Sequence, residues 1–451
     1  MKRFGIVLTL FFGVMAVDLV TAKLTPEQVS SLPPAATRPV DFTHDIKPIF
    51  DASCIRCHGR GRTRGGFQLD SRETLLKGGD SGPAVILRKS EDSLLIELVS
   101  GLNPDEVMPK KGSRLTPEQV GLLRAWIDQG GGWDTGISFA RPEPVNLLPR
   151  KPSIQIDTSS GANPIDLILQ RYFREHGIKP AKVVSDQVFA RRAYLDLVGL
   201  APPRDGPGAF VTDGDPELRG RLVKALLADN QDYAEHWLTF WNDLLRNDYR
   251  GTGYIDGGRK PITKWLFSAL LNNLPYDQFV AELISPSPQS EGFTKGIVWR
   301  GVVNASQTPA MQAAQNISQV FMGVNLKCAS CHDSFINDWR LADSYGLACV
   351  YSDGPLEMFQ CDKPTGLTAQ ARFIYPELGQ IDTRASRPDR LRELAKIITG
   401  PKDGRLSRTI VNRLWARFFG RGLIEPVDDM EQSAWDPDLL DWLAEDLVAH
   451  H

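Results

Sequence analysis

Two copies of the pattern Cys-x-x-Cys-His constrain this chain more than any other feature. Residues 54–58 read Cys-Ile-Arg-Cys-His, and residues 328–332 read Cys-Ala-Ser-Cys-His. The pattern places two thiols and an imidazole on one short stretch of chain. Two thiols can bond the two vinyl groups of a haem, and the imidazole can ligate its iron. Each motif therefore predicts one covalently bound haem.

Paired cysteines also occur in redox-active loops and in zinc sites. A thioredoxin-like pair has no use for a His directly after it, and a zinc site needs further Cys or His residues nearby, which neither motif has. We therefore predict two haem c cofactors. The predicted thioether cysteines and proximal iron ligands are Cys54, Cys57 and His58 for the first haem, and Cys328, Cys331 and His332 for the second.

The N-terminus has the pattern of a secretory signal peptide. Lys2 and Arg3 precede the apolar stretch Phe4–Val17, and small residues at 20–22 offer a cleavage point. The alternative is a retained membrane anchor, but the apolar stretch is shorter than the roughly 20 residues that span a bilayer. We expect residues 1–22 to be removed and the protein to be periplasmic or in the cell envelope, with no transmembrane segment after cleavage.

The remaining sequence predicts a mainly α protein without a nucleic-acid footprint. Its 52 basic and 55 acidic residues nearly balance, and no basic face stands out. We divide the 451 residues as follows: signal peptide 1–22, leader 23–40, small cytochrome c-like helical domain 41–133, linker 134–163, larger helical domain with the second motif 164–352, irregular connection 353–385, and a last helical unit 386–451.

The first domain closes with a well-marked helix that follows a candidate iron ligand. Thr116 is an N-cap, Pro117 suits the first helical position, and Gln119 completes a capping box. Met108 and Pro109 lie on the polar loop before this helix. A thioether ligand raises the reduction potential of a haem. We predict Met108 as the sixth ligand of the first haem, with core filling as the alternative.

From residue 164 onward the apolar residues recur mostly at helical spacing. The predicted helices cover 164–176, 186–198, 216–228, 231–247 and 309–322, and the last helical unit begins at 389. The irregular connection holds one expected short strand, at 373–375. The two cysteines outside the motifs, Cys349 and Cys361, form either a disulfide or two free thiols.

Several strings resemble a planctomycete family. Residues 41–133 resemble the planctomycete cytochrome C domain, and residues 164–352 and 386–451 resemble the planctomycete-specific domains of unknown function that follow it. The matching strings are 45–50, 54–59, 78–83, 108–109 and 115–130 in the first domain, 191–203 and 328–339 in the second, and 411–415, 419–423 and 425–429 in the third.

The resemblance implies a haem protein of the cell envelope and supplies no enzymatic activity. Two departures from the family pattern matter. Ser334 stands where the family often has a second His, and the last domain normally runs on beyond His451, so the chain is either a shortened member or a fragment.

Three functions compete. Electron transfer with redox partner proteins of the cell envelope is the leading hypothesis. A dihaem peroxidase or oxidase needs an open iron position and acid–base groups, for which Asp333, Asp338 and Arg340 beside the second motif are candidates, with solvated side chains as the alternative. A redox-tagged scaffold that binds a partner protein or polysaccharide is the third.

The sixth ligand of the second haem is the least determined position. His236 lies in mid-helix beside Trp237 and Trp241, where it is either an iron ligand or a hydrogen-bonded core residue. The other candidates are Met311, Met322 and Met358. His44, His176 and His450 are less suited to the role because of their positions in the sequence.

A mass measurement tests the number of haems. Protein matured in a host that attaches haem c should have the mass of the polypeptide plus two haems. The polypeptide plus one haem, with Cys328 and Cys331 free to alkylate, would contradict the prediction. Replacing both cysteines of the second motif by Ser provides the one-haem reference.

Overall fold

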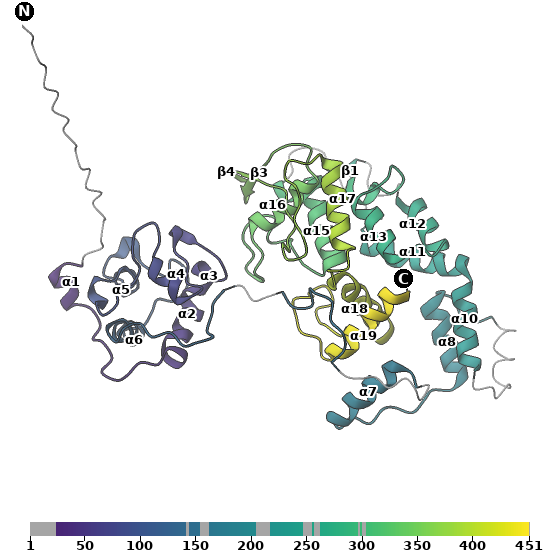
Figure 1. Cartoon of the computed structure of the whole chain (residues 1–451), viewed down its shortest axis with the longest axis horizontal. Helices are drawn as coiled ribbons and strands as arrows, with labels where there is room; N and C mark the ends of the chain where they lie inside the picture. The colour runs from purple at the N-terminus through teal and green to yellow at the C-terminus, as the bar shows by residue number, and fades with distance from the viewer. Residues whose placement is uncertain are drawn as a thin grey trace, which may run out of the picture. The chain divides into compact units, whose positions relative to one another are not determined.

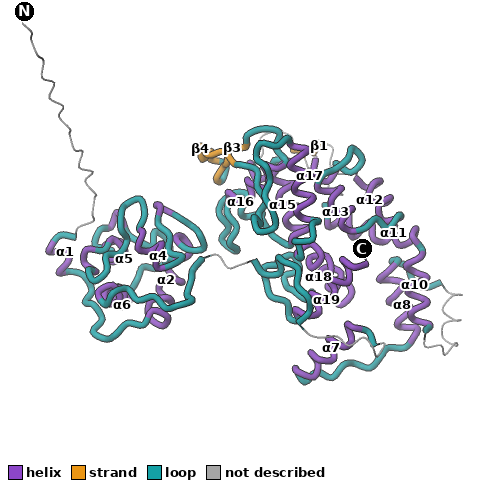
Figure 2. Tube along the Cα trace, viewed as in Figure 1, coloured by secondary structure: helices purple, strands orange, loops and turns teal. Residues whose placement is uncertain are grey.

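The computed structural model describes residues 24–140, 144–153, 162–203, 217–246, 255–256, 262–295, 298–299 and 304–450. The predicted signal peptide, residues 1–22, lies outside these ranges. The chain is mainly α, as predicted (Figures 1 and 2), and forms two compact units, residues 1–143 and 144–451. The boundary falls inside the predicted linker 134–163. None of the helices in the described ranges has the length and apolar character needed to cross a bilayer.

The first unit is built from short helices around an aromatic core. The helices are α1 (Pro26–Ser30), α2 (Lys47–Ser53), α3 (Ile55–His58), α4 (Arg72–Lys77), α5 (Leu94–Ser100) and α6 (Pro117–Asp128). A π-helical turn, Phe42–Ile46, precedes α2, and 3₁₀ turns occupy Arg64–Gly66, Ser90–Asp92 and Pro104–Glu106.

The predicted start of α6 is confirmed. The Thr116 hydroxyl accepts a hydrogen bond from the Gln119 backbone N–H at 3.2 Å, and the Gln119 side chain accepts one from the Thr116 N–H at 2.9 Å. These two bonds satisfy N–H groups that the first helical turn leaves without partners. The helix buries Val120, Leu123 and Trp126.

The aromatic core lies directly behind the first Cys-x-x-Cys-His motif. Phe42 stacks on Trp133 with 4.3 Å between ring centroids, and Phe50 meets Trp126 edge-on at 5.7 Å. Phe139, near the end of the unit, packs against Phe50 at 6.1 Å. The segment 134–140 is therefore part of the first unit and not free linker.

The second unit contains the remaining helices. They are α7 (Pro164–Glu175), α8 (Asp186–Leu197), α10 (Leu218–Ala228), α11 (Asn230–Leu244), α12 (Ile262–Leu271), α13 (Tyr276–Ile284), α14 (Gly292–Lys295), α15 (Pro309–Met322), α16 (Leu341–Val350), α17 (Arg387–Ile398), α18 (Arg405–Phe419) and α19 (Pro437–His450); Ala305–Gln307 is a 3₁₀ turn. Five of them, α7, α8, α10, α11 and α15, agree with predicted helices, and α17, α18 and α19 lie in the predicted last helical unit. The helices α12, α13, α14 and α16 are not among the predicted ranges.

The core of the second unit is centred on α15, which packs against α16 and α18. The α15 side chains Met311, Ile317 and Phe321 are almost completely buried. The second Cys-x-x-Cys-His motif lies in the connection between α15 and α16. This packing fixes both ends of the segment that carries the motif.

Two antiparallel strand pairs are present in the described residues. β1 (Ile255–Asp256) pairs with β2 (Val298–Trp299), and β3 (Leu356–Gln360) pairs with β4 (Lys363–Ala369), as Figure 2 shows in orange for the second pair. The β3–β4 hairpin corrects the prediction that 353–385 is an irregular connection.

The expected strand at Phe373–Tyr375 is wrong. These three consecutive side chains are all buried, whereas a strand at the edge of a core alternates its faces. The true strands went unrecognised because β4 contains Pro364 and Gly366, which are usually depleted in strands.

Buried arginines of α18 fix residues 145–150 to the second unit. The Arg408 Nε donates to Asp441 Oδ1 at 2.7 Å, and its Nη1 donates to the Leu148 carbonyl at 2.8 Å. Arg150 also pairs with Asp441, at 3.0 Å. Arg405 contacts the carbonyl of Val145. Residues 145–150 of the predicted linker are therefore held in the second unit by these contacts.

Replacing Arg408 tests the importance of this anchor. Arg408→Met should lower the free energy of unfolding of the second unit by about 3–5 kcal/mol, because it removes one partner of a buried ion pair. Urea unfolding followed by tryptophan fluorescence measures the change. The control Arg392→Met, in the exposed pair with Asp389, should cost only about 0–1 kcal/mol. Equal effects of the two variants would contradict the role of burial.

Candidate haem sites

The first motif folds as a single tight turn at the end of α2. The backbone N–H groups of Cys57 and His58 both donate to the carbonyl of Cys54, at 3.1 and 3.0 Å. Cys54 is the N-cap of α3, and Cys57 and His58 lie in that short helix, so the turn holds both thiols and the imidazole close together. Burial, with a smaller contribution from Cys57, raises the pKa of Cys54 to about 12, so this residue is a neutral thiol in the unmodified chain.

His58 is oriented by a carbonyl outside the motif. Its Nδ1 lies 3.3 Å from the carbonyl oxygen of Phe67, and the two rings are 5.1 Å apart. When Nδ1 carries the proton and donates it to this carbonyl, Nε2 keeps its lone pair for a metal. Burial lowers the pKa of His58, which favours the neutral imidazole that ligation requires.

The Gly- and Arg-rich loop after the first motif is held close to it. The Arg60 N–H donates to the Phe139 carbonyl at 2.7 Å, and the Asp80 N–H donates to the Gly65 carbonyl at 2.8 Å. A side chain at Gly59 would meet Ile55 at 2.6 Å, so only glycine fits there without a shift. The loop therefore has a defined path beside the cysteines.

Met108 lies at the edge of the same core as the first motif. It is half-buried and packs, together with Cys54 and Phe67, against the apolar cluster of the first unit. Its backbone N–H donates to the Leu98 carbonyl at 2.8 Å, which ties the loop to α5. A thioether here has an apolar setting on a fixed loop, as an axial ligand requires.

The second motif forms the same turn in an unrelated setting. The N–H groups of Cys331 and His332 both lie 3.2 Å from the carbonyl of Cys328. Unlike the first motif, which ends in α3, the second motif lies in no regular helix, because α15 ends at Met322 and α16 begins at Leu341. The Gln315 side chain of α15 donates to the Ser330 hydroxyl at 2.8 Å, so the turn is attached to the core helix.

His332 is also oriented through Nδ1, and it lies beside exposed apolar side chains. Nδ1 is 2.8 Å from the Asp333 carbonyl oxygen, which again leaves Nε2 available. The ring of Phe335 is 4.5 Å from that of His332. Phe335 and Ile336 are 68% and 73% exposed, although large apolar side chains are usually buried.

Both turns fit a covalently attached haem. Each presents two half-buried thiols and an imidazole that a backbone carbonyl orients at Nδ1, and two thiols with one imidazole are the donor set of haem c. An aromatic side chain adjoins the histidine of each turn, Phe67 at the first and Phe335 at the second. Within the described ranges, no three His, Cys, Asp or Glu residues gather as a separate metal site.

The polar residues after the second motif stabilise the chain locally. The Asp333 carboxylate accepts a hydrogen bond from the Leu341 N–H at 3.1 Å, at the start of α16. Ser334, which replaces the family His, is buried, and its hydroxyl accepts from the N–H groups of Ile336 and Asn337. The Arg340 backbone N–H donates to Asp343 at 2.9 Å. Asp333 and Ser334 thus shape the loop.

His236 has partners for its imidazole within the protein. Its Nε2 is 3.1 Å from the Arg417 guanidinium, and the ring also hydrogen-bonds the backbone of Asp196. Nδ1 lies so close to Gly199 that a Cβ there would be 2.2 Å away. Burial, and then the Arg417 charge, lower the pKa of His236. This placement favours the hydrogen-bonded core role over ligation.

The remaining candidates occupy varied positions. Met311 and Met322 are buried in the α15 core, whereas Met358 on β3 is only partly buried. His44 pairs with Asp41 on the surface, and the His176 ring stacks on Tyr172 at the end of α7.

Cys349 and Cys361 are both free thiols and lie in different places. The buried Cys349 hydrogen-bonds the Ala369 carbonyl at the open end of the β3–β4 hairpin. Cys361 lies at the turn of that hairpin, where its N–H donates to the Cys331 carbonyl at 2.9 Å. A disulfide between them is excluded in this fold, because the length of β4 separates the two positions.

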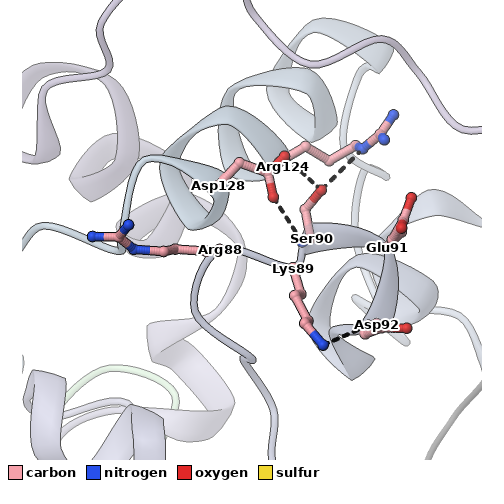
Figure 3. Close-up of a pocket in the computed structure, with 7 residues that line it drawn as sticks. All are labelled: Arg88, Lys89, Ser90, Glu91, Asp92, Arg124 and Asp128. Atoms are coloured by element: carbon pink, nitrogen blue, oxygen red, sulfur yellow. Dashed lines mark hydrogen bonds and ion pairs between the residues drawn. The ribbon is translucent and has the colours of Figure 1, made fainter.

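A polar pocket on the first unit is distinct from both candidate haem sites. Figure 3 shows it between the Ser90 turn and α6, lined by Arg88, Lys89, Ser90, Glu91, Asp92, Arg124 and Asp128. Ser90 donates to Asp128 through its backbone N–H at 2.8 Å and its hydroxyl at 2.9 Å. These contacts stabilise the fold and offer no apolar wall for a haem.

Family comparisons agree with the domain order predicted from the sequence. Residues 54–112 match the model described as Planctomycete cytochrome C. Residues 164–354 match a Protein of unknown function (DUF1549), and residues 390–451 match a Protein of unknown function (DUF1553). No curated protein and no solved structure matches the chain. The first motif lies in the cytochrome C match and the second in the DUF1549 match.

The placement of His236 leads to a spectroscopic prediction. His236→Ala should leave the spin state of the second haem unchanged, because its Nε2 is paired with the Arg417 guanidinium at 3.1 Å. His332→Ala, the matched control, should change that spectrum by removing the proximal ligand. Absorption and electron paramagnetic resonance spectra of the two variants make the comparison. Conversion of the second haem to high spin in His236→Ala would identify His236 as a ligand after all.

Proposed function

We propose that this chain, with the planctomycete cytochrome C, DUF1549 and DUF1553 domains in that order, is an exported dihaem c-type cytochrome that transfers electrons. The cytochrome C domain itself implies haem c and a c-type cytochrome. The second haem, the electron-transfer role and the export are the further content of the proposal.

The observation that carries the proposal is the repetition of one turn in two unlike settings. In both motifs, the carbonyl of the first cysteine accepts the N–H groups of the second cysteine and of the histidine. In both, a backbone carbonyl holds Nδ1 of that histidine. A phenylalanine ring also lies beside each histidine, Phe67 at the first motif and Phe335 at the second, although the two motifs join different helices.

A bound haem supplies an iron that alternates between the ferrous and ferric states. The two cysteines of each motif would hold a haem by thioether bonds, and His58 and His332 would ligate its iron. The carbonyls of Phe67 and Asp333 keep the two rings in position. Met108 would complete the ligation of the first iron, and its thioether and apolar setting would favour the reduced state.

The contacts around the second motif favour a carrier over a peroxidase. A peroxidase needs acid–base groups directed at an open iron position. Asp333 instead accepts the N–H that begins α16, and Ser334 stands in place of a second imidazole. The exposed Phe335 and Ile336 give the second haem an apolar border at the surface. We propose that redox proteins of the cell envelope exchange electrons there.

Replacing Met108 tests the ligation of the first haem. Met108→Leu keeps the apolar volume but removes the sulfur, so the methionine–iron charge-transfer band should disappear and the reduction potential of this haem should fall. Spectroelectrochemistry of the holoprotein measures both. Met430→Leu, a buried methionine of the other unit, should leave band and potential unchanged. Retention of the band in Met108→Leu would assign the ligand elsewhere.

A further inference from the structure

A third cysteine lies against the second haem motif. Cys361 and Asp362 form the two-residue turn of the β3–β4 hairpin, with φ angles of 48° and 65°. Positive φ at both turn positions is typical of a type I′ hairpin, which Asn and Gly usually form. Cysteine is an uncommon choice there, and the turn directs this cysteine to the motif.

The hairpin turn is docked firmly on the motif. The Cys361 N–H donates to the Cys331 carbonyl at 2.9 Å. Asp362 accepts from the Asn304 side chain at 2.7 Å and from the Ala305 N–H at 3.2 Å. On the other side of the turn, the Phe359 N–H donates to the Tyr345 hydroxyl at 3.1 Å. The position of Cys361 is therefore fixed from both sides.

The two cysteines meet the distance requirement for a disulfide. The backbone hydrogen bond between Cys361 and Cys331 limits their Cα atoms to at most roughly 7 Å, from standard bond lengths. This is the upper limit for bridging two cysteines without moving the backbone. The two side chains also lie close enough to interact, because burial, and then the Cys361 side chain, raises the pKa of Cys331.

We propose that Cys331 and Cys361 form a disulfide in the exported chain before the second haem is attached, and that this bond controls loading of that haem. Each thiol loses its hydrogen, and the two electrons and two protons reduce the disulfide of an exported dithiol–disulfide oxidase to its dithiol. A thiol reductant reverses the exchange and restores both thiols.

The effect of the disulfide on loading of the second haem rests on the proposed dihaem function, whereas formation of the disulfide itself does not depend on that function. In haem attachment the thiol of Cys331 adds across a vinyl group, forming a carbon–sulfur bond while its hydrogen goes to the other vinyl carbon. A disulfide sulfur has no hydrogen to add, so Cys331 stays blocked until it is reduced. The loaded protein then carries Cys361 as a free thiol.

The first motif serves as an internal comparison for the proposed disulfide. Of the six cysteines in the sequence, only Cys54 and Cys57 lie in the first unit. No third cysteine of that unit can compete for them. Loading of the first haem should therefore not depend on Cys361, in any variant.

Peptide mapping tests the disulfide without any haem. The full chain is exported in a host that lacks haem attachment, and free thiols are alkylated at once. Trypsin releases peptides Cys328–Arg340 and Leu341–Arg372, which the proposed disulfide joins. Cys349→Ser should retain the link, and Cys361→Ser should abolish it. Full alkylation of Cys361, or a bond only between Cys328 and Cys331, would overturn the proposal.

Measuring haem loading tests whether the disulfide limits attachment of the second haem. In a host that attaches haem c but has limiting thiol reductant, the wild-type chain should carry mainly one haem, by intact mass. Added reductant, or Cys361→Ser, should raise the two-haem share several-fold, while Cys349→Ser should behave as wild type. Equal loading of wild type and Cys361→Ser would overturn the proposed effect of the disulfide on haem loading. If the second haem is absent under every condition, the dihaem function is contradicted. The peptide map then tests the disulfide independently.

Discussion

One backbone carbonyl organises each candidate haem site. The carbonyl of Cys54, and likewise that of Cys328, accepts the N–H groups of the next cysteine and of the histidine. These bonds close a turn in which two sulfurs and one imidazole are fixed by a few residues of local chain. The rest of each unit has only to support that turn and orient the ring, and the two units do so by different means.

The first unit supports its turn with aromatic rings and the second with a helix pair. Phe50, one turn before Cys54, is completely buried between Trp126 and Phe139, so the end of α2 cannot move. In the second unit, Gln315 of α15 holds Ser330 inside the motif. Because the hydrogen bonds that close the turn lie within the motif itself, the same turn forms in two different surroundings in this chain.

The sequence predicted what depends on short-range chemistry. The two motifs, the capping box at Thr116 and the helix after Pro309 each need only neighbours a few residues away. The β3–β4 hairpin was not predicted, because Pro364 and Gly366 obscure the strand pattern and its turn lacks the usual Asn-Gly. The environment of His236 depends on Arg417, 181 residues further along the chain, and no periodicity reveals such a pairing.

The same contrast between contacts of sequence neighbours and contacts of distant residues explains why the sequence does not indicate the proximity of Cys361 to Cys331. In the sequence, Cys361 is closer to Cys349 than to Cys331, so the two cysteines outside the motifs were considered as a pair. The hairpin reverses this order: Cys349 contacts Ala369 at the open end, while the turn brings Cys361 to the motif. A cysteine outside the motifs thus lies against Cys331, one of the predicted haem-binding cysteines. The chemistry of a cysteine follows from what the fold places beside it, and that placement is decided here by the two-residue turn of the hairpin.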